Sequence, residues 1–85
     1  MVPHFARGHR LREDKARGRW VILAPERVFE PDDIAVEVLQ LVDGVRTLDE
    51  IIDALAAKFT APRSAIAADV SVLLADLQER QVLTG

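Results

Sequence analysis

The chain has 85 residues, 49% of them hydrophobic, and no cysteine, which suits one packed domain and excludes disulfides, thiolate metal sites and cysteine nucleophiles. Its net charge of −3 is divided unevenly, because residues 1–30 carry seven basic and four acidic side chains whereas residues 31–85 carry four and ten. No apolar run approaches the roughly 20 residues that cross a bilayer, and no apolar segment follows the basic N-terminus as in a signal peptide. We expect a cytoplasmic protein that does not enter the membrane.

The N-terminal residues predict an arm followed by a first short strand. Residues 1–9 contain Pro3 and Gly8 and show no periodicity, which is typical of a mobile N-terminal arm. The sequence RLRED that follows is compatible with a strand. We therefore place a single domain at residues 10–85, preceded by the arm.

Two further strands are expected before residue 31. Arg19–Ala24 is the clearest, since aromatic and β-branched residues are bounded by turn residues. Pro25 suits the second position of a type I turn. Arg27–Glu30 alternates, with Arg27 and Phe29 on one face, and Pro31 ends it. The three strands are short enough to form one small antiparallel sheet.

The first helix is predicted to begin after Asp32, a reasonable N-cap. Its apolar residues Ile34, Val38 and Leu41 fall on one stripe. Gly44 stands where a residue with a left-handed backbone is expected at a helix end. The sequence thus indicates a helix followed by a tight turn.

The second helix begins with the pattern T-x-x-E at Thr47 and Glu50. This is a capping box, in which each side chain accepts a hydrogen bond from the backbone N–H of the other residue. Its expected buried face comprises Leu48, Ile51, Ile52, Leu55 and Phe59.

A third helix starts near Pro62, which fits a first helical turn. Its apolar residues recur at helical spacing, with Leu74 on one shoulder of the stripe and Asp69 on the other; the stripe comprises Ile66, Val70, Leu73 and Leu77. Val82 and Leu83 are expected to pack under the core. The predicted fold class is α+β, with a three-stranded antiparallel sheet followed by a three-helix bundle.

The helix–turn–helix joint raises the possibility of DNA binding, but the charges oppose it. Recognition helices neutralise phosphates with Lys and Arg. The third helix offers only Arg63 and Arg80 against Asp69, Asp76 and Glu79. We expect no nucleic-acid partner, and a winged-helix domain that regulates transcription is the alternative.

The sequence contains no arrangement typical of an enzyme. The carboxylate pairs at residues 32–33 and at residues 49 and 53 suit a helix start and a solvated helix face. His4 and His9 both fall in the predicted arm, and no third ligand lies at metal-site spacing. We therefore expect no catalytic activity, metal or cofactor.

The remaining class is a binding module. The strand at Arg27–Glu30 precedes the helices, and an exposed sheet edge can pair with an extended peptide when side-chain pockets lie beside it. Val70 and Leu74 on the third helix could form the floor of such a groove. The same residues could instead be core, and for Leu73 and Leu77 the core is favoured.

Three segments of the chain resemble one family in order and spacing. They are WVILAPERV, VLQLVDGVRTLDEII and DVSVLLADLQERQVL, which together lie within residues 10–83. The most specific block is Asp43–Ile51, which combines turn, cap and helix face, and Pro25-Glu26 and Asp69-Val70 add to it. The chain resembles the PqqD family of pyrroloquinoline quinone biosynthesis. It departs from the family where glycine is common, at Arg27 and Gln81.

The resemblance implies a winged-helix-like peptide chaperone, also called a RiPP recognition element. Such a protein binds the ribosomal precursor peptide PqqA and presents it to the radical SAM enzyme PqqE, as a monomer or a homodimer. The peptide is expected to add to the third strand and lie against the third helix. The peptide-binding residues predicted on this basis are Glu26, Arg27, Val28, Phe29, Glu30, Asp69, Val70, Leu73 and Leu74.

Overall fold

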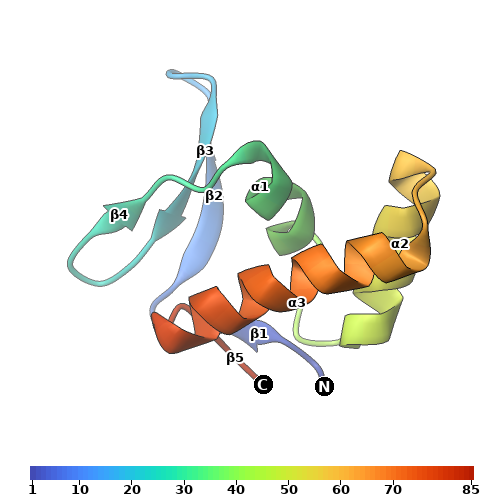
Figure 1. The fold of residues 1–85 in the computed structure, drawn as a ribbon. Coiled ribbons are helices and arrows are strands. Elements are labelled where there is room, and N and C mark those ends of the chain that lie inside the picture. Colours follow the sequence, from blue (N-terminus) through green and yellow to red (C-terminus); the bar gives the residue numbers. More distant parts are fainter.

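The computed structural model describes residues 1–85 and contains five short strands and three helices (Figure 1). The strands are β1 (His4–Phe5), β2 (Arg10–Asp14), β3 (Arg19–Leu23), β4 (Val28–Phe29) and β5 (Leu83–Thr84). The helices are α1 (Asp33–Leu39), α2 (Leu48–Phe59) and α3 (Arg63–Glu79). This order confirms the predicted α+β fold, with three antiparallel strands ahead of three helices.

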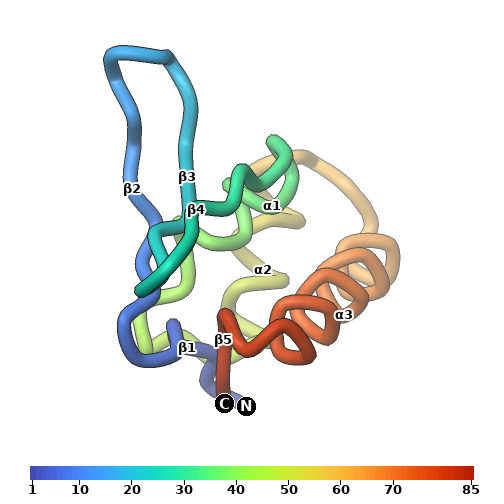
Figure 2. The backbone as a smooth tube through the Cα atoms, turned by 90° about the vertical axis from the view of Figure 1, so that its left-hand side faces the viewer, coloured from blue at the N-terminus to red at the C-terminus, as the bar shows by residue number.

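The sheet has the strand order β2-β3-β4, so β4 is an edge strand. Ile22 of β3 pairs with Phe29 of β4, and both pack with the helices in the core. Because side chains alternate across a strand, Val21 faces the other side of the sheet. Figure 2 shows the β2–β3 hairpin extending from the body of the molecule, while α3 lies apart from it.

The two ends of the chain are joined by a second pair of strands. β1 pairs antiparallel with β5, and the Ala6 N–H donates to the Val82 carbonyl at 2.8 Å. Pro3 is buried, and the Met1 carbonyl accepts from the Leu48 N–H at 2.9 Å. The structure thus shows a packed strand where the sequence suggested a free arm at residues 1–9. The pairing was not expected because its partner lies at the opposite end of the sequence.

Helix α1 is shorter than its apolar pattern suggested. Its N-cap is as predicted, since the Asp32 carboxylate accepts from the Ala35 N–H at 2.8 Å. Its buried residues are Ala35, Val38 and Leu39. The predicted stripe is wrong at Ile34, which is 69% exposed, whereas Leu41 lies beyond the end of the helix but packs against the core. Seven residues make only two turns, so the direction of the neighbouring helices decides which side is buried.

The turn between α1 and α2 is held by one carboxylate. Asp43 accepts hydrogen bonds from the backbone N–H groups of Arg46 at 2.8 Å and Val45 at 2.9 Å. These bonds favour the ionised form and lower the pKa of Asp43. Gly44 has a φ of +78°, the left-handed conformation expected for it. The turn is therefore held by bonds between residues that are close in the sequence.

The capping box at the start of α2 is confirmed. The Thr47 hydroxyl accepts from the Glu50 N–H at 3.1 Å, and the Glu50 carboxylate accepts from the Thr47 N–H at 2.9 Å. The buried residues of α2 are Ile51, Ile52 and Leu55. Phe59, which the pattern placed in the core, is 50% exposed.

Helix α3 crosses the front of the molecule in Figure 1 and covers α2 and β5. Its buried residues are Val70, Leu74 and Leu77. Val82 and Leu83 lie in the same core, as predicted. None of the helices has the length and apolar character needed to cross a membrane.

The paired carboxylates of α2 have a structural partner. The Arg63 guanidinium at the start of α3 donates to Asp53 at 2.6 Å and to Asp49 at 3.0 Å. These bonds raise the pKa of Arg63, with the Asp53 contact contributing most. The two acids therefore tie α3 to α2. No group of three potential metal ligands is found in the structure.

Candidate functional site

The edge strand β4 has one free side. It pairs with β3 through Ile22–Phe29 and Leu23–Val28, and no strand lies beyond it. The Ala24 N–H donates to the Arg27 carbonyl at 3.0 Å, so the backbone N–H and C=O of Arg27 point toward β3. Hydrogen-bonding direction alternates along an antiparallel strand, so the N–H and C=O of Val28 point outward. This edge can accept one more extended chain.

A groove lies directly beside this edge, between β4 and the C-terminal half of α3. We call it the strand–helix groove, and its volume is about 280 Å³. Its apolar lining includes Ile22 and Phe29 from the sheet and Leu73 and Leu77 from α3. Its charged lining comprises Glu30, Asp32, Asp76 and Arg80. A chain paired with β4 would direct alternate side chains into this groove.

A second hollow lies further along α3, where α1 and α2 meet it. This interhelix pocket has a volume of about 330 Å³, and its surface is mostly apolar. Its apolar residues are Ile34, Val38, Leu55, Phe59, Ile66 and Val70. The exposure of Ile34 and Phe59 is explained by their place in this pocket rather than in the closed core.

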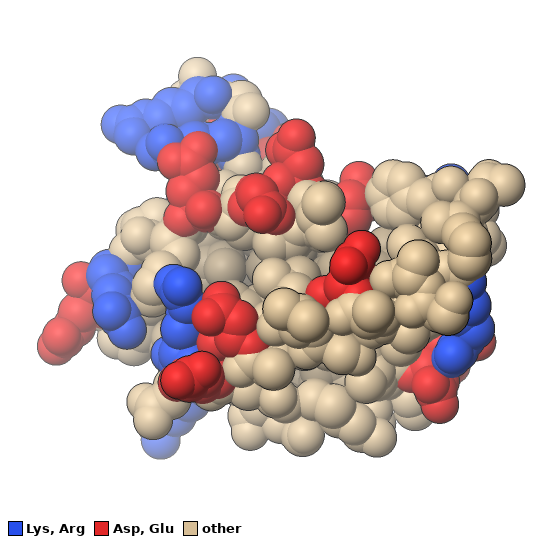
Figure 3. Space-filling model, viewed as in Figure 1, with Lys and Arg blue, Asp and Glu red and all other residues tan.

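The same face of α3 lines both hollows. Ile66, Asp69 and Val70 border the interhelix pocket, and Leu73, Asp76, Leu77 and Arg80 border the strand–helix groove. These residues recur at intervals of three or four, as one helical face requires. Figure 3 shows a strip of uncharged surface along α3, with acidic side chains on both sides of it. The two hollows are therefore arranged along one line that starts at β4.

The charged side chains that border the two hollows are mostly acidic. Glu30 is held by Arg19 at 2.9 Å, and Asp76 is held by Arg80 at 3.2 Å. Asp33 and Asp69, which border the interhelix pocket, have no ion-pair partner. The free carboxylates favour a ligand that brings positive charge to this end and disfavour a nucleic acid.

Comparison with known proteins assigns the chain to a family. Residues 19–83 match the family model described as Coenzyme PQQ synthesis protein D (PqqD). The chain belongs to the PqqD family. The "PqqA binding protein" of Rhodopseudomonas palustris strain HaA2 is 57% identical over 82 residues, which cover 96% of this chain and 80% of that protein. The protein of the same name from Gluconobacter oxydans strain 621H is 49% identical, over 96% and 85% of the two chains.

Two solved structures of PqqD proteins are similar to this fold. The solution NMR structure of the PqqD truncation of Methylobacterium extorquens PqqCD has a TM-score of 0.82 and 45% identity, over 99% of this chain and 89% of that one. It is described as a functional, stand-alone RiPP recognition element. The crystal structure of PqqD from Xanthomonas campestris has a TM-score of 0.65 and 45% identity, over 100% and 94%. The PqqD fold predicted from the sequence is thereby confirmed.

The structure divides the predicted peptide-binding residues of this PqqD protein among several places. Phe29, Glu30 and Leu73 line the strand–helix groove, and Asp69 and Val70 line the interhelix pocket. These five are brought together along the face of α3.

The remaining predicted residues lie elsewhere. Glu26 and Arg27 line a hollow at the turn before β4, beside the end of α3. The Arg27 guanidinium lies 4.7 Å from the centre of the Phe29 ring, which keeps it on the groove side of the sheet. Val28 is 60% exposed on the opposite face. Leu74 is 2% exposed and lines neither hollow. The sequence favoured Leu73 for the core and Leu74 for the groove floor, and the structure reverses these two positions.

Several residues that line the two hollows were not predicted as site residues. They are Asp33, Ile34, Phe59, Asp76 and Arg80. Helical spacing from Leu73 could have identified Asp76 and Arg80, which follow it by three and seven residues. Ile34 and Phe59 carried no such signal, because an exposed and a buried apolar residue look alike in a sequence.

Gln81 has a backbone conformation that glycine adopts more readily than other residues. It follows Arg80, the C-cap of α3, with a φ of +63°, and Thr60 is the only other non-glycine residue with positive φ. A left-handed backbone costs most residues about 1–2 kcal/mol. Arg27 has no positive φ, so its side chain is accommodated there without backbone strain.

Proposed function

We propose that this protein binds the precursor peptide PqqA in the cytoplasm and presents it to the radical SAM enzyme PqqE during pyrroloquinoline quinone biosynthesis. One observation carries the proposal: the free edge of β4 lies directly beside the strand–helix groove. The relatives named PqqA binding protein support the identity of the peptide. Presentation to PqqE rests on the family resemblance.

Recognition begins with main-chain pairing. The outward N–H and C=O of Val28 bond to the backbone of an extended peptide, which extends the sheet by one strand. This pairing requires no particular side chains, so it supplies affinity rather than selectivity. The protein acts in this way as a monomer or a homodimer.

Selectivity comes from side chains that enter the two hollows. Phe29 and Leu73 offer apolar contacts at the edge, and Val70 and Ile66 continue them along α3. Aliphatic or aromatic side chains of the peptide fit these contacts, since each buried apolar group gains about 25 cal/mol per Å². Carboxylates Asp33 and Asp69 at the far end favour a peptide segment that carries Lys or Arg there.

The substitution Val28→Pro tests the pairing. It removes the outward N–H and leaves the β3–β4 hydrogen bonds in place, because proline is tolerated at an edge position whose N–H faces solvent. We expect PqqA affinity, measured by calorimetry, to fall about fivefold to tenfold through the lost bond. Val28→Thr is the matched control, since it keeps the N–H and should bind as the wild type does.

The melting temperature of each variant shows whether the sheet is intact. A folded Val28→Pro protein with wild-type affinity for PqqA would exclude pairing at this edge. A loss of affinity in Val28→Thr as large as in Val28→Pro would point to the side chain and contradict the role of the backbone.

A further inference from the structure

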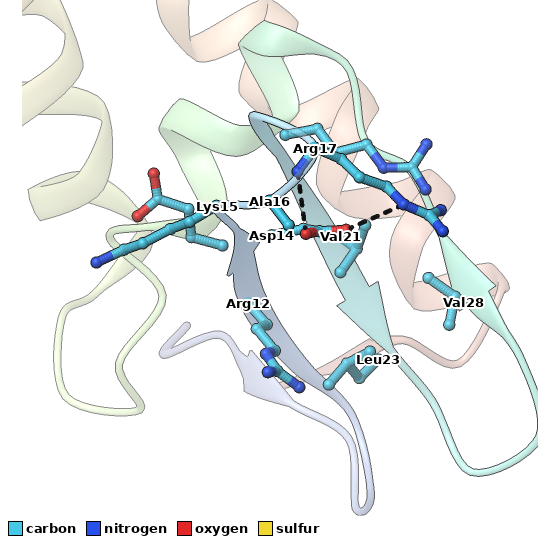
Figure 4. Close-up of a pocket in the computed structure, with 10 residues that line it drawn as sticks. Arg12, Asp14, Lys15, Ala16, Arg17, Val21, Leu23 and Val28 are labelled. Carbon is cyan, nitrogen blue, oxygen red and sulfur yellow. Dashed lines mark hydrogen bonds and ion pairs between the residues drawn. The ribbon is translucent and has the colours of Figure 1, made fainter.

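The face of the sheet that points away from the helices carries a further hollow, of about 680 Å³. Its floor is formed by Val21, Leu23 and Val28, and Arg12 and Arg17 stand beside it. Figure 4 shows these side chains on one side of the β2–β3 hairpin, with the Arg17 guanidinium near Asp14. No residue of the helices lines this hollow.

The strand register interleaves cations with apolar side chains on this face. Arg10 pairs with Leu23, and Arg12 pairs with Val21. Residues directly opposite on two strands project to the same side, so each arginine stands beside an apolar neighbour. We call the surface formed by Arg10, Arg12, Lys15, Val21, Leu23 and Val28 the outer sheet face.

The positive charge of this face is only partly compensated, because Glu13 and Asp14 line the hollow beside the more numerous cations Arg12, Lys15, Arg17 and Arg19. Arg10, Arg12 and Lys15 have no ion pair and no side-chain hydrogen bond, whereas Arg17 lies 3.9 Å from Asp14 and Arg19 donates to Glu30. The hairpin also projects from the body, so these charges are reachable (Figure 2). In Figure 3 basic side chains gather at the top of the view, at the hairpin, and acidic side chains lie directly below them.

We propose that the outer sheet face docks an acidic surface of the enzyme that receives the bound peptide. This inference rests on the proposed function. The peptide occupies the β4 edge and the helix side of the sheet, so the outer face stays open for a second protein. Acidic side chains of the enzyme would meet Arg10, Arg12 and Lys15, and small apolar groups would cover the floor at Leu23 and Val28.

The apolar floor favours a protein over a nucleic acid as the occupant. A phosphate backbone would be attracted by the cations but would make no favourable contact with exposed Val28 and half-buried Leu23. The acidic side chains that border the two hollows on the other side would repel it. A symmetric contact with a second copy would place two cationic faces against each other. Charges on such a surface mainly set the association rate and its dependence on salt.

The test compares two variants of equal net charge. Arg12→Glu with Lys15→Glu reverses the outer sheet face, and Arg7→Glu with Arg46→Glu makes the same change in net charge away from the hairpin tip. Binding of purified PqqE to the PqqA-loaded protein is measured by calorimetry at two salt concentrations. We expect the hairpin variant to bind the enzyme about tenfold more weakly, because steering and contact are both lost. The control should stay near the wild type.

The binding of PqqA alone separates this inference from the proposed function. Both variants should bind the peptide as the wild type does, since neither change touches the groove. Equal enzyme binding by the two variants would overturn the inference and leave the proposed function standing. Three other results would also overturn the inference. They are a loss of peptide affinity in the hairpin variant, a salt-resistant complex of the wild type with duplex DNA that the hairpin variant does not form, and self-association through the outer sheet face. Failure of the wild type to bind PqqE, with PqqA binding intact, would contradict the delivery role itself.

Discussion

The helical part and the strand-bearing N-terminal part of this protein use charge in opposite ways. In residues 31–85 all four cations are in ion pairs, and they are Arg46, Lys58, Arg63 and Arg80. In residues 1–30 five of seven cations have no ion pair, and they are Arg7, Arg10, Arg12, Lys15 and Arg27. The helical part pairs its own basic groups with nearby carboxylates. The N-terminal part leaves cations and one strand edge unoccupied, which suits contact with partners.

The comparison also applies to stability. The core is built mainly from α1, α2 and α3, and of the sheet only Ile22 is fully buried within it. We therefore expect the helical part to carry most of the free energy of folding. Substitutions in the two parts should differ sharply in their effect.

The largest difference is expected between Ile51→Ala and Val28→Ala. Ile51 is 0% exposed, so its truncation leaves a cavity and should cost about 2–5 kcal/mol. Val28 is exposed at the sheet edge, and its truncation should change stability by less than about 0.5 kcal/mol. Urea denaturation of both variants measures this, and similar midpoints would contradict the division between the two parts.

A smaller loss is expected for Thr47→Ala, which removes one half of the capping box. The lost cap should cost about 0.5–2 kcal/mol of unfolding free energy. Because the box lies outside both hollows, the affinity for PqqA measured below the melting range should not change. Thr47→Ser, which keeps the hydroxyl, is the control. Reduced peptide binding by a folded Thr47→Ala protein would show that the joint contacts the ligand.

Gln81→Gly should stabilise the protein modestly. It relieves the left-handed strain at φ +63°, and the greater freedom of glycine in the unfolded chain offsets part of that gain. We expect a net gain on the order of 0.5 kcal/mol by thermal or urea unfolding. Gln81→Ala keeps the strain and should give no gain. Destabilisation by glycine would mean that the Gln81 side chain makes a contact that outweighs the strain.

The smallest expected effect is on the pH dependence of stability. Since the pKa of Asp43 is lower in the folded state than in the unfolded state, its contribution to stability is present above the unfolded value. That contribution is lost as pH falls through the folded pKa. A carboxyl titration by NMR should place the Asp43 midpoint below the ordinary aspartate range. Arg46→Gln should preserve most of this shift, because the backbone bonds from Arg46 and Val45 are its main causes.

Local features were predictable from the sequence, and the contacts between distant segments were not. The Asp32 cap, the Thr47–Glu50 box and the left-handed Gly44 each depend on residues within three or four positions, so their patterns identified them. The β1–β5 pair joins the two ends of the chain, and no short pattern encodes such a pairing.

For the candidate site, the sequence predicted which elements form it but not which α3 residues face it. The alternation after the Pro25 turn indicated the strand, and the position of α3 beside it followed from the family resemblance. Successive helical residues differ by about 100° in direction, so the rotation of α3 about its axis decides which of Leu73 and Leu74 faces the core and which faces the groove. The rotation is set by packing against α2, which the α3 sequence alone does not specify.

The most direct test of the central claim is an NMR titration of the labelled protein with PqqA. The account predicts that chemical-shift changes concentrate in residues 26–30 and along the face of α3 that carries Ile66, Val70 and Leu73. It also predicts little change at the tip of the β2–β3 hairpin. Changes confined to residues 1–9 and to the turn at residues 15–19 would contradict the account, because the peptide would then be held by the basic part of the chain rather than by the β4 edge and the α3 face.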